Sequence, residues 1–172
     1  MTVKTAIITG AAQGIGKAIA FQLAKDGFHT IICDLNEEKL VTAKQELKDQ
    51  GFDCSTYVVD VSRRDEVFQM VDDVGNIHGG LDVMVANAGV VQVKPLIDIT
   101  EEDLDRMFKV NVYGTLYSIQ AAAKQMMKQK YGKIINASST SGKRAVELLG
   151  HYAATKFAVI ALTQAAANSA LQ

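Results

Sequence analysis

The first twenty residues restrict this chain to few folds. An apolar run at residues 6–8 leads into Thr9-Gly10-Ala11-Ala12-Gln13-Gly14-Ile15-Gly16, and apolar residues then recur at helical spacing. This pattern predicts a strand, a tight glycine loop and a helix. Glycine suits such a loop because it permits a chain reversal, close approach of the backbone to a pyrophosphate, and close helix–strand packing. The start of the helix offers free N–H groups and the positive end of its dipole to phosphate.

The glycine spacing is G-x-x-x-G-x-G, whereas the common dinucleotide fingerprint is G-x-G-x-x-G. We therefore expect a relative of that loop. The residues predicted to contact a dinucleotide there are Gly10, Gln13, Gly14, Ile15 and Gly16. Taken alone, the motif leaves open an ordinary glycine turn after a strand.

Length and composition exclude several classes of protein. With 172 residues, we expect a single domain over 1–172, and 18 basic against 19 acidic residues do not favour binding to nucleic acid or to an anionic membrane. Cys33 and Cys54 lie in or beside strand-like runs without metal-ligand spacing, so no metal site is predicted. No apolar run is long enough to span a membrane, and we expect a soluble, cytoplasmic protein.

Strand-like and helical segments alternate along the whole chain. Predicted strands follow at 29–34, 55–60, 81–86 and 133–137, with helices at 37–49, around 67–74, at 101–128 and from about 150 onward. Continuously apolar strands separated by helices indicate a parallel sheet that is covered on both faces. The predicted fold class is therefore α/β, a doubly wound parallel sheet of the Rossmann type.

Two predicted helices, 101–128 and 152–170, are apolar over more of their surface than one buried stripe requires. Thr100 is the expected N-cap of the first, with Asp103 in its first turn. Packing on the sheet would cover one side of each helix and leave a second apolar side. We therefore predict a homodimer or homotetramer that is formed through these two helices.

Asp34 ends the predicted second strand, 18 positions after Gly16. A carboxylate there can accept hydrogen bonds from the adenosine ribose hydroxyls, and it repels a 2′-phosphate. No lysine or arginine lies next to it in the sequence. This position favours NAD over NADP as the cofactor. The alternative is that Asp34 serves only as an acidic residue before the next helix.

Tyr152 and Lys156 are four residues apart and so lie on the same face of one helix. A neighbouring cation stabilises a phenolate, which helps a tyrosine to act as a general acid and base. The pair is weak as an isolated motif, because such spacings arise by chance. Its meaning depends on the other motifs of the chain.

Together these motifs resemble the short-chain dehydrogenase/reductase family over the whole chain. In chain order the matching residues are Thr9-Gly10-x-x-x-Gly14-Ile15-Gly16, Asp34, Asp60-Val61, Asn87-Ala88-Gly89, Asn111, Ser138-Ser139 and Tyr152-x-x-x-Lys156. The resemblance implies an oxidoreductase that uses NAD and a small carbonyl or alcohol substrate. Asp60 and Val61 would flank the adenine. Residues 87–89 would form the floor of the cofactor site, and Ala86 replaces a common second asparagine.

The catalytic roles are likewise implied by the resemblance. Tyr152 would donate and accept the proton, and Lys156 would assist it and hold the nicotinamide ribose. Ser139, thirteen residues before the tyrosine, would bind the substrate oxygen, with Ser138 as the competing candidate. Asn111 would hold a water that relays protons to Lys156.

The substrate is implied by a narrower resemblance. Residues 92–96, 134–139 and 152–167 are most similar to those of acetoin and diacetyl reductases, also called butanediol dehydrogenases, which interconvert small vicinal diketones, hydroxyketones and diols. The alternatives are a 3-oxoacyl-carrier-protein reductase, a sugar-alcohol dehydrogenase, or an inactive cofactor-binding truncation product. Family members continue into further strands and a substrate lid, so we expect this chain to be truncated at its C-terminus.

Overall fold

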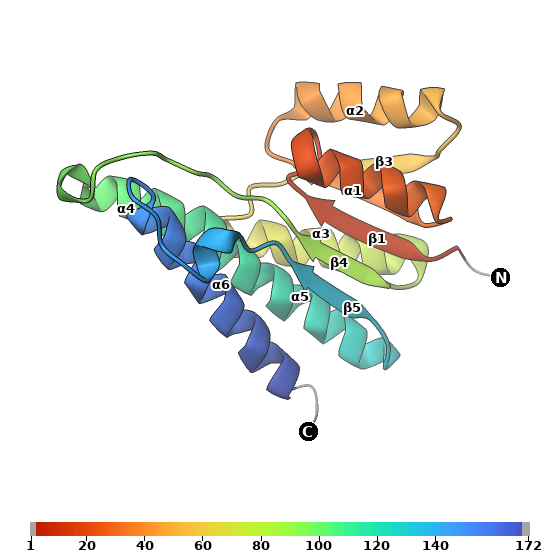
Figure 1. Ribbon diagram of the computed structural model, residues 1–172. Helices are drawn as coiled ribbons and strands as arrows, with labels where there is room; N and C mark the ends of the chain where they lie inside the picture. The colour runs from red at the N-terminus through yellow and green to blue at the C-terminus, as the bar shows by residue number, and fades with distance from the viewer. Residues whose placement is uncertain (1–2, 170–172) are drawn as a thin grey trace.

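The computed structural model describes residues 3–169, which form a parallel sheet with helices on both faces (Figure 1). The strands are β1 (Thr5–Thr9), β2 (His29–Asp34), β3 (Cys54–Val58), β4 (Val83–Ala86) and β5 (Lys133–Asn136). The helices are α1 (Gly14–Lys25), α2 (Glu37–Asp49), α3 (Arg64–His78), η1 (Leu96–Asp98), α4 (Glu101–Phe108), η2 (Lys109–Tyr113), α5 (Gly114–Gln129), η3 (Thr140–Gly142) and α6 (Gly150–Ser169).

The strand order is β3-β2-β1-β4-β5, and every pair is parallel. Ile7 in the central strand β1 lies opposite Ile31 on one side and Met84 on the other. The chain crosses from β3 to β4 next to β1, so the winding direction reverses between β1 and β4. In open parallel sheets, ligands bind in the crevice at this point, outside the carboxyl ends of the strands. The predicted doubly wound α/β fold is confirmed.

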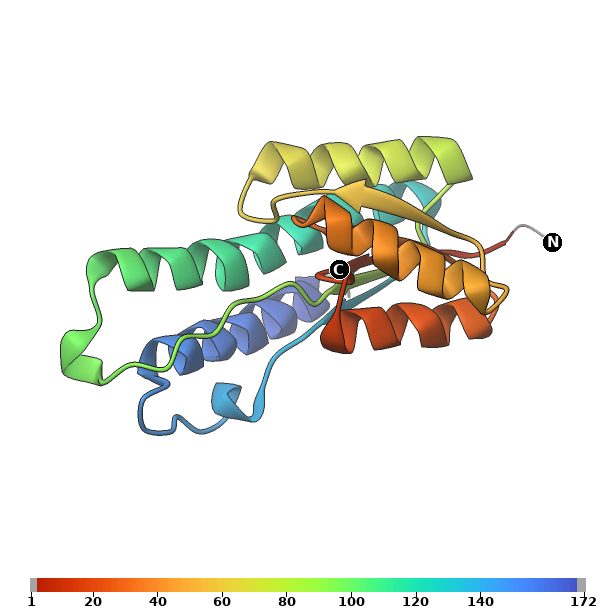
Figure 2. The ribbon, with the colours of Figure 1, turned by 90° about the horizontal axis from the view of Figure 1, so that it is seen from above.

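Alternation along the strands builds two cores. Residues such as Ile7, Ile31 and Met84 pack with α3 and α5, whereas Ala6, Ile8 and Ile32 pack with α1 and α2. Figure 2 shows these helix pairs on opposite sides of the sheet. Because both faces are covered at the centre of the sheet, β1 and β4 are buried along their whole length, as the apolar runs of the sequence indicated, whereas the outer strands β3 and β5 are partly exposed.

Three predicted strands are shorter in the structure. The strand predicted at 55–60 is Cys54–Val58, because Asp60 N–H donates to Glu66 Oε2 at 2.9 Å. The strand predicted at 81–86 begins at Val83, since the main chain of Leu81 is bonded by the side chain of Gln129. The strand predicted at 133–137 ends at Asn136. In the first two, a side chain takes the place of the neighbouring strand.

The first of the two long helices differs from prediction. The helix predicted at 101–128 extends to Gln129 and contains a π-helical turn, η2, between α4 and α5. Thr100 is its N-cap and Asp103 lies in its first turn, as predicted, and the two side chains form a capping box that was not predicted. The helix predicted from about residue 150 begins at Gly150, in agreement with the prediction, and residue 170 lies outside the described residues. Among residues 3–169, no helix is both long and apolar enough to cross a membrane.

Candidate active site

The glycine loop depends on two different properties of glycine. Gly10 and Gly14 have φ angles of +65° and +57°, in the left-handed region that favours glycine. A Cβ on Gly16 would lie 2.3 Å from the carbonyl oxygen of Gly10, so helix α1 can approach the end of β1 only without a side chain there. Around the corresponding position of Gly14 there is no atom within 4 Å. The loop is therefore tight on its inner side and open on its outer side.

The start of α1 is left without a capping group. Its N-cap, Gln13, makes no side-chain cap hydrogen bond, and the first turn carries no acidic residue. In contrast, α2 is capped by Asn36 and α4 by Thr100, and both have acidic residues in the first turn. The unsatisfied N–H groups and the positive dipole end of α1 are thus available to an anionic ligand.

The glycine loop is fixed to the end of β4 by two polar side chains. Asn87 Nδ2 donates to the carbonyls of Thr9 at 3.0 Å and Gly10 at 3.3 Å. The Thr9 hydroxyl in turn accepts from the main-chain N–H groups of Asn87 and Ala88, both at 3.1 Å. These bonds join the two strands at the point where the winding of the sheet reverses.

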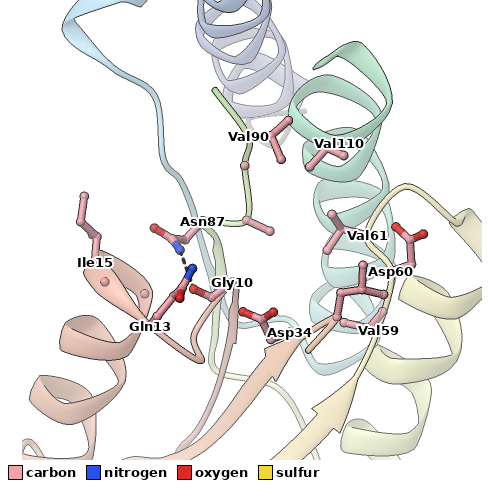
Figure 3. A pocket seen from close by; sticks show the side chains of 15 residues that line it. Gly10, Gln13, Ile15, Asp34, Val59, Asp60, Val61, Asn87, Val90 and Val110 are labelled. Carbon is pink, nitrogen blue, oxygen red and sulfur yellow. Dashed lines mark hydrogen bonds between the residues drawn. The ribbon is translucent and has the colours of Figure 1, made fainter. Parts of the chain in front are cut away.

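A cleft of about 380 Å³ lies over these strand ends (Figure 3). All eleven residues predicted from the glycine loop, Asp34, and the Asp60-Val61 and Asn87-Ala88-Gly89 motifs line it. Leu35, Val59, Val90 and Val110 also line it and were not predicted. They are apolar residues beside the motifs, and a single sequence gives no signal that separates them from core positions.

Asp34 lies at the end of β2, two residues before the N-cap of α2. Its Oδ2 accepts from Ala12 N–H at 3.3 Å and its Oδ1 from Asn36 N–H at 3.1 Å. The carboxylate is thereby held at the wall of the cleft beside the glycine loop, where Figure 3 shows it near Val59 and Gly10.

The structure also brings a cation to this region. Lys39, in the first turn of α2, donates from Nζ to Gln13 Oε1 at 2.8 Å. Gln13 itself lines the cleft, so the rim near Asp34 carries both charges. Lys39 was not predicted to lie at this site, because it is not adjacent to Asp34 in the sequence.

Asn111 lies in the π-helical turn and is completely buried. Its Oδ1 accepts from Val90 N–H at 2.8 Å, and its Nδ2 donates to Val90 O at 2.9 Å and to Thr155 Oγ1 at 3.0 Å. The side chain joins three segments that are distant in sequence: η2, the loop after β4, and α6. Single π-helical turns inside α-helices often occur at functional sites.

Lys156 is 5% exposed, and its Nζ donates to the carbonyl of Ala137 at 2.9 Å. Burial lowers its pKa, because desolvation disfavours the charged ammonium. Nζ lies 5.7 Å from the ring centroid of Tyr152, one turn earlier in α6. Tyr152 is half-buried, and within residues 3–169 its hydroxyl forms no hydrogen bond that would occupy it.

The two candidate serines have different environments. Ser138 Oγ donates to the carbonyl of Lys156 at 3.0 Å, which anchors the segment after β5 to α6. Ser139 Oγ accepts from Ser141 N–H at 3.1 Å, so its own hydroxyl hydrogen stays available to another acceptor. This difference favours Ser139 as the residue that meets a substrate oxygen.

The cleft and the tyrosine side of the site meet at Gly89. A Cβ on Gly89 would lie 3.2 Å from Asn111 Oδ1 and 3.6 Å from Lys156 Nζ. None of the four predicted catalytic residues, Asn111, Ser139, Tyr152 and Lys156, lines the cleft itself, although Tyr152 and Lys156 were also predicted to bind the cofactor. Asn111 and Lys156 lie next to its Gly89 end.

Comparison of the sequence with those of known proteins identifies its family. Residues 4–172 match the family model described as short chain dehydrogenase. A diacetyl reductase, (S)-acetoin forming, of Staphylococcus epidermidis is 50% identical over 166 residues, which are 96% of this chain and 65% of the relative. The chain thus spans about two thirds of the length of this relative.

Solved structures agree in fold. A xylitol dehydrogenase bound to NAD⁺ superposes with a TM-score of 0.94 at 33% identity and covers 98% of this chain and 65% of its own. A metagenomic short-chain oxidoreductase in complex with NADP has a TM-score of 0.91 at 32% identity, covering 96% of this chain and 76% of its own. Similar folds therefore carry either nicotinamide cofactor.

Proposed function

We propose that this chain, which belongs to the short-chain dehydrogenase family, is the cofactor-binding and catalytic part of an NAD(H)-dependent oxidoreductase that acts on a small ketone or secondary alcohol. The observation that carries the proposal is the meeting of two regions at Gly89. The cleft over the strand ends reaches Gly89, and the Asn111 Oδ1 and Lys156 Nζ atoms lie next to it.

The residues of the cleft fit a dinucleotide. The uncapped start of α1 and the open space around Gly14 suit a pyrophosphate, and Asp34 offers a carboxylate to ribose hydroxyls. When bound, the cofactor would supply hydride chemistry: NADH would donate a hydride in ketone reduction, and NAD⁺ would accept one in alcohol oxidation. Because Asp34 disfavours a 2′-phosphate, we assign NAD rather than NADP.

Tyr152 is proposed as the general acid and base. Its hydroxyl would donate a proton to the substrate oxygen in ketone reduction and remove it in alcohol oxidation. Lys156, with one ammonium hydrogen bonded to Ala137 O, retains donors for a ribose hydroxyl and for stabilising the phenolate. Ser139 would hydrogen-bond the substrate oxygen. Asn111 would position Val90 and Thr155 and hold a proton-relaying water.

As substrate we propose diacetyl, acetoin or 2,3-butanediol, on the basis of similarity to the staphylococcal diacetyl reductase. A sugar-alcohol dehydrogenase is the second candidate, which the similarity to a xylitol dehydrogenase structure supports. A 3-oxoacyl-carrier-protein reductase or an inactive truncation product are the remaining alternatives.

The test is NADH oxidation followed at 340 nm with diacetyl, acetoin, xylulose and an acetoacetyl thioester. Highest kcat/KM with diacetyl or acetoin supports the assignment, and preference for xylulose favours the second candidate. NADH binding without turnover of any of them would support the inactive alternative. Absence of NADH binding would contradict the proposal as a whole.

We also propose that the protein assembles through α4–α5 and α6. Leu104, Tyr113 and Phe157 on these helices are 41%, 45% and 47% exposed, more than large apolar and aromatic side chains of a monomer need to be. A two-fold dimer that pairs these helices would cover them, and repetition would give a tetramer. Light scattering after size exclusion is the test. A monodisperse monomer would refute this arrangement.

Both cysteines, Cys33 and Cys54, are free and buried, which is consistent with a reducing, cytoplasmic location. We expect residues 1–172 to behave as one domain. A single cooperative transition in urea, followed by fluorescence and circular dichroism together, would support this, and two transitions would contradict it.

A further inference from the structure

A series of hydrogen bonds, separate from the one around Asn111, reaches α6 next to Tyr152. His151 Nε2 lies 3.0 Å from Gln92 Oε1, and Gln92 Nε2 donates to Asp103 Oδ1 at 2.8 Å. The other carboxylate oxygen of Asp103 accepts from Lys94 Nζ and from Thr100 N–H. His151 is only 3% exposed. These hydrogen bonds thus connect the first turn of α6, the loop after β4 and the first turn of α4.

The direction of these bonds follows from the carboxylate. Hydrogen bonds from Lys94 and Gln92 hold the pKa of Asp103 well below its usual range, so the carboxylate is ionised and can only accept. Gln92 must therefore present its amide N–H to Asp103 and its carbonyl to His151. It follows that His151 donates from Nε2. Its Nδ1, which is buried, has no hydrogen-bond partner among the described residues.

A similar series of hydrogen bonds runs through Asn111. His151 and Thr155 are one helical turn apart on α6; Thr155 is bonded to the long helix and His151 to the loop after β4. Thr155 is linked through Asn111 to Val90, and His151 is linked through Gln92 to Asp103. Two tethers therefore hold the turn of α6 that contains Tyr152, one on each side along the helix axis.

The surrounding loops are joined at the same place. Lys94 N–H donates to the carbonyl of Leu148 at 2.9 Å, which ties the loop after β4 to the segment before α6. Leu148 has a φ of +65°, a left-handed conformation that is strained for leucine. Such strain persists only where neighbouring contacts enforce it. The segment just before His151 is therefore held in a defined conformation by its contact with the loop after β4.

We propose that Gln92 and His151 are positioning residues for Tyr152. Their hydrogen bond, oriented by Asp103, fixes the first turn of α6 against the loop after β4 and thereby sets the place of the tyrosine hydroxyl relative to the Gly89 end of the cleft. Neither side chain needs to touch the substrate in this role. The inference rests on the proposed function only where it concerns catalysis.

The direct test is the ¹⁹F NMR spectrum of protein that contains 3-fluorotyrosine at its five tyrosines, with the Tyr152 signal assigned by Tyr152→Phe. Gln92→Met, which keeps the length of the side chain but removes both hydrogen bonds, should shift or broaden the Tyr152 signal. The matched control is Gln45→Met, since Gln45 makes a similar bond to Asp49 on the exposed side of α2. It should leave Tyr152 unchanged.

His151 offers an independent pair of variants. His151→Phe removes the donor and should shift Tyr152, whereas His151→Gln retains an N–H that can reach Gln92 and should restore the signal toward wild type. An unchanged Tyr152 signal in Gln92→Met and His151→Phe would overturn the proposal. So would equal shifts in His151→Phe and His151→Gln.

Turnover gives a second readout. If Gln92 positions Tyr152, the kcat of Gln92→Met should fall roughly tenfold to a hundredfold, because displacement of a reacting group affects the chemical step. The KM for NADH should stay within about twofold of the wild-type value. A purely structural role would lower the melting temperature and leave kcat unchanged at a permissive temperature. If the wild type turns over no substrate, the proposed function fails, and the NMR result still decides the positioning role.

Discussion

Around the glycine loop the site is made of main chain, whereas around Tyr152 it is made of side chains. The loop presents N–H groups and open space at the start of α1, and its geometry depends on the positive φ angles of Gly10 and Gly14 and on the missing Cβ atoms of Gly10 and Gly16. The part of α6 that carries Tyr152 and Lys156 depends instead on partners from the segment after β5, from η2 and from the loop after β4. The two regions meet at Gly89.

The difference teaches that binding and chemistry in this fold have different structural requirements. A pyrophosphate needs several weak donors in a fixed arc, which one short segment can provide. A proton transfer needs one hydroxyl at one place, and four segments must agree to hold it. Substitutions in the first region should therefore change cofactor affinity, and substitutions in the second should change turnover.

The largest effect is expected for Tyr152→Phe. Removing the hydroxyl should lower kcat by about 10²- to 10⁴-fold, since no other acid would reach the substrate oxygen, while NADH affinity changes by about twofold or less because the ring is kept. Stopped-flow turnover and fluorescence titration with NADH measure the two quantities. Residual activity near the wild-type level would assign the proton transfer to another residue and break the contrast between the regions.

The next effect is expected for Gly16→Ala. The new Cβ would lie 2.3 Å from Gly10 O and 2.6 Å from Asn87 Nδ2, so the start of α1 must move. We expect a loss of about 1–3 kcal/mol in the free energy of unfolding and at least a tenfold loss of NADH affinity.

Gly14→Ala is the matched control for Gly16→Ala. It meets no atom within 4 Å, and its cost is limited to about 1–2 kcal/mol of backbone strain at a φ of +57°. Urea unfolding and NADH titration compare the two variants. Equal losses of affinity in both would show that closeness of packing is not what the loop requires.

A smaller change is expected in the choice of cofactor. Asp34→Asn keeps the hydrogen-bonding shape but removes the charge, and it should lower the ratio of NADH to NADPH affinity by about tenfold, which corresponds to roughly 1.4 kcal/mol of repulsion. Lys39→Ala should raise the same ratio, since it removes a cation from the rim. Titrations with both cofactors decide this. An unchanged ratio in Asp34→Asn would refute the role of the carboxylate.

The smallest effect concerns His29, the first residue of β2, whereas the cleft lies at the other end of this strand. Burial, and secondarily the charge of His78, lower the pKa of His29 from its ordinary value of 6.5, and Asp53 opposes them while Lys44 adds to them. Below that value the unfolded chain binds the proton more readily than the folded protein does. Stability should therefore decline as the pH falls through about 6.5 and level off once the folded protein is protonated as well.

Thermal unfolding between pH 5 and 8 measures the effect of His29. The ring of His78 lies 4.6 Å from that of His29, and His78→Gln should weaken the pH dependence. NADH affinity should be the same in this variant and the wild type, because both regions of the site are distant. A pH dependence that remains in His29→Gln would assign it to other groups.

Much of this protein was predictable from its sequence because the signals are local. Apolar strands that alternate with helices indicated the parallel sheet, and the glycine spacing with Asp34 indicated the cleft, which the glycine-loop residues and Asp34 line. Thr100 could be predicted as an N-cap for the same reason. The strands, the glycine loop and the helix start are each set by residues that are neighbours in the chain or belong to one periodic pattern.

What the sequence did not reveal depends on contacts between distant segments. The π-helical turn at Asn111, the bond of Lys39 to Gln13, and the link from His151 through Gln92 to Asp103 join residues whose separation carries no periodic signal. The bond of Ser138 to Lys156 O, which adds to the preference for Ser139 that spacing had given, is a contact of the same kind. Local sequence determined the strand, loop and helix that can hold a phosphate, because φ angles and helix ends are properties of short segments. Only the tertiary structure decided how Tyr152 is held, because its supporting atoms come together only when the sheet and α6 have packed.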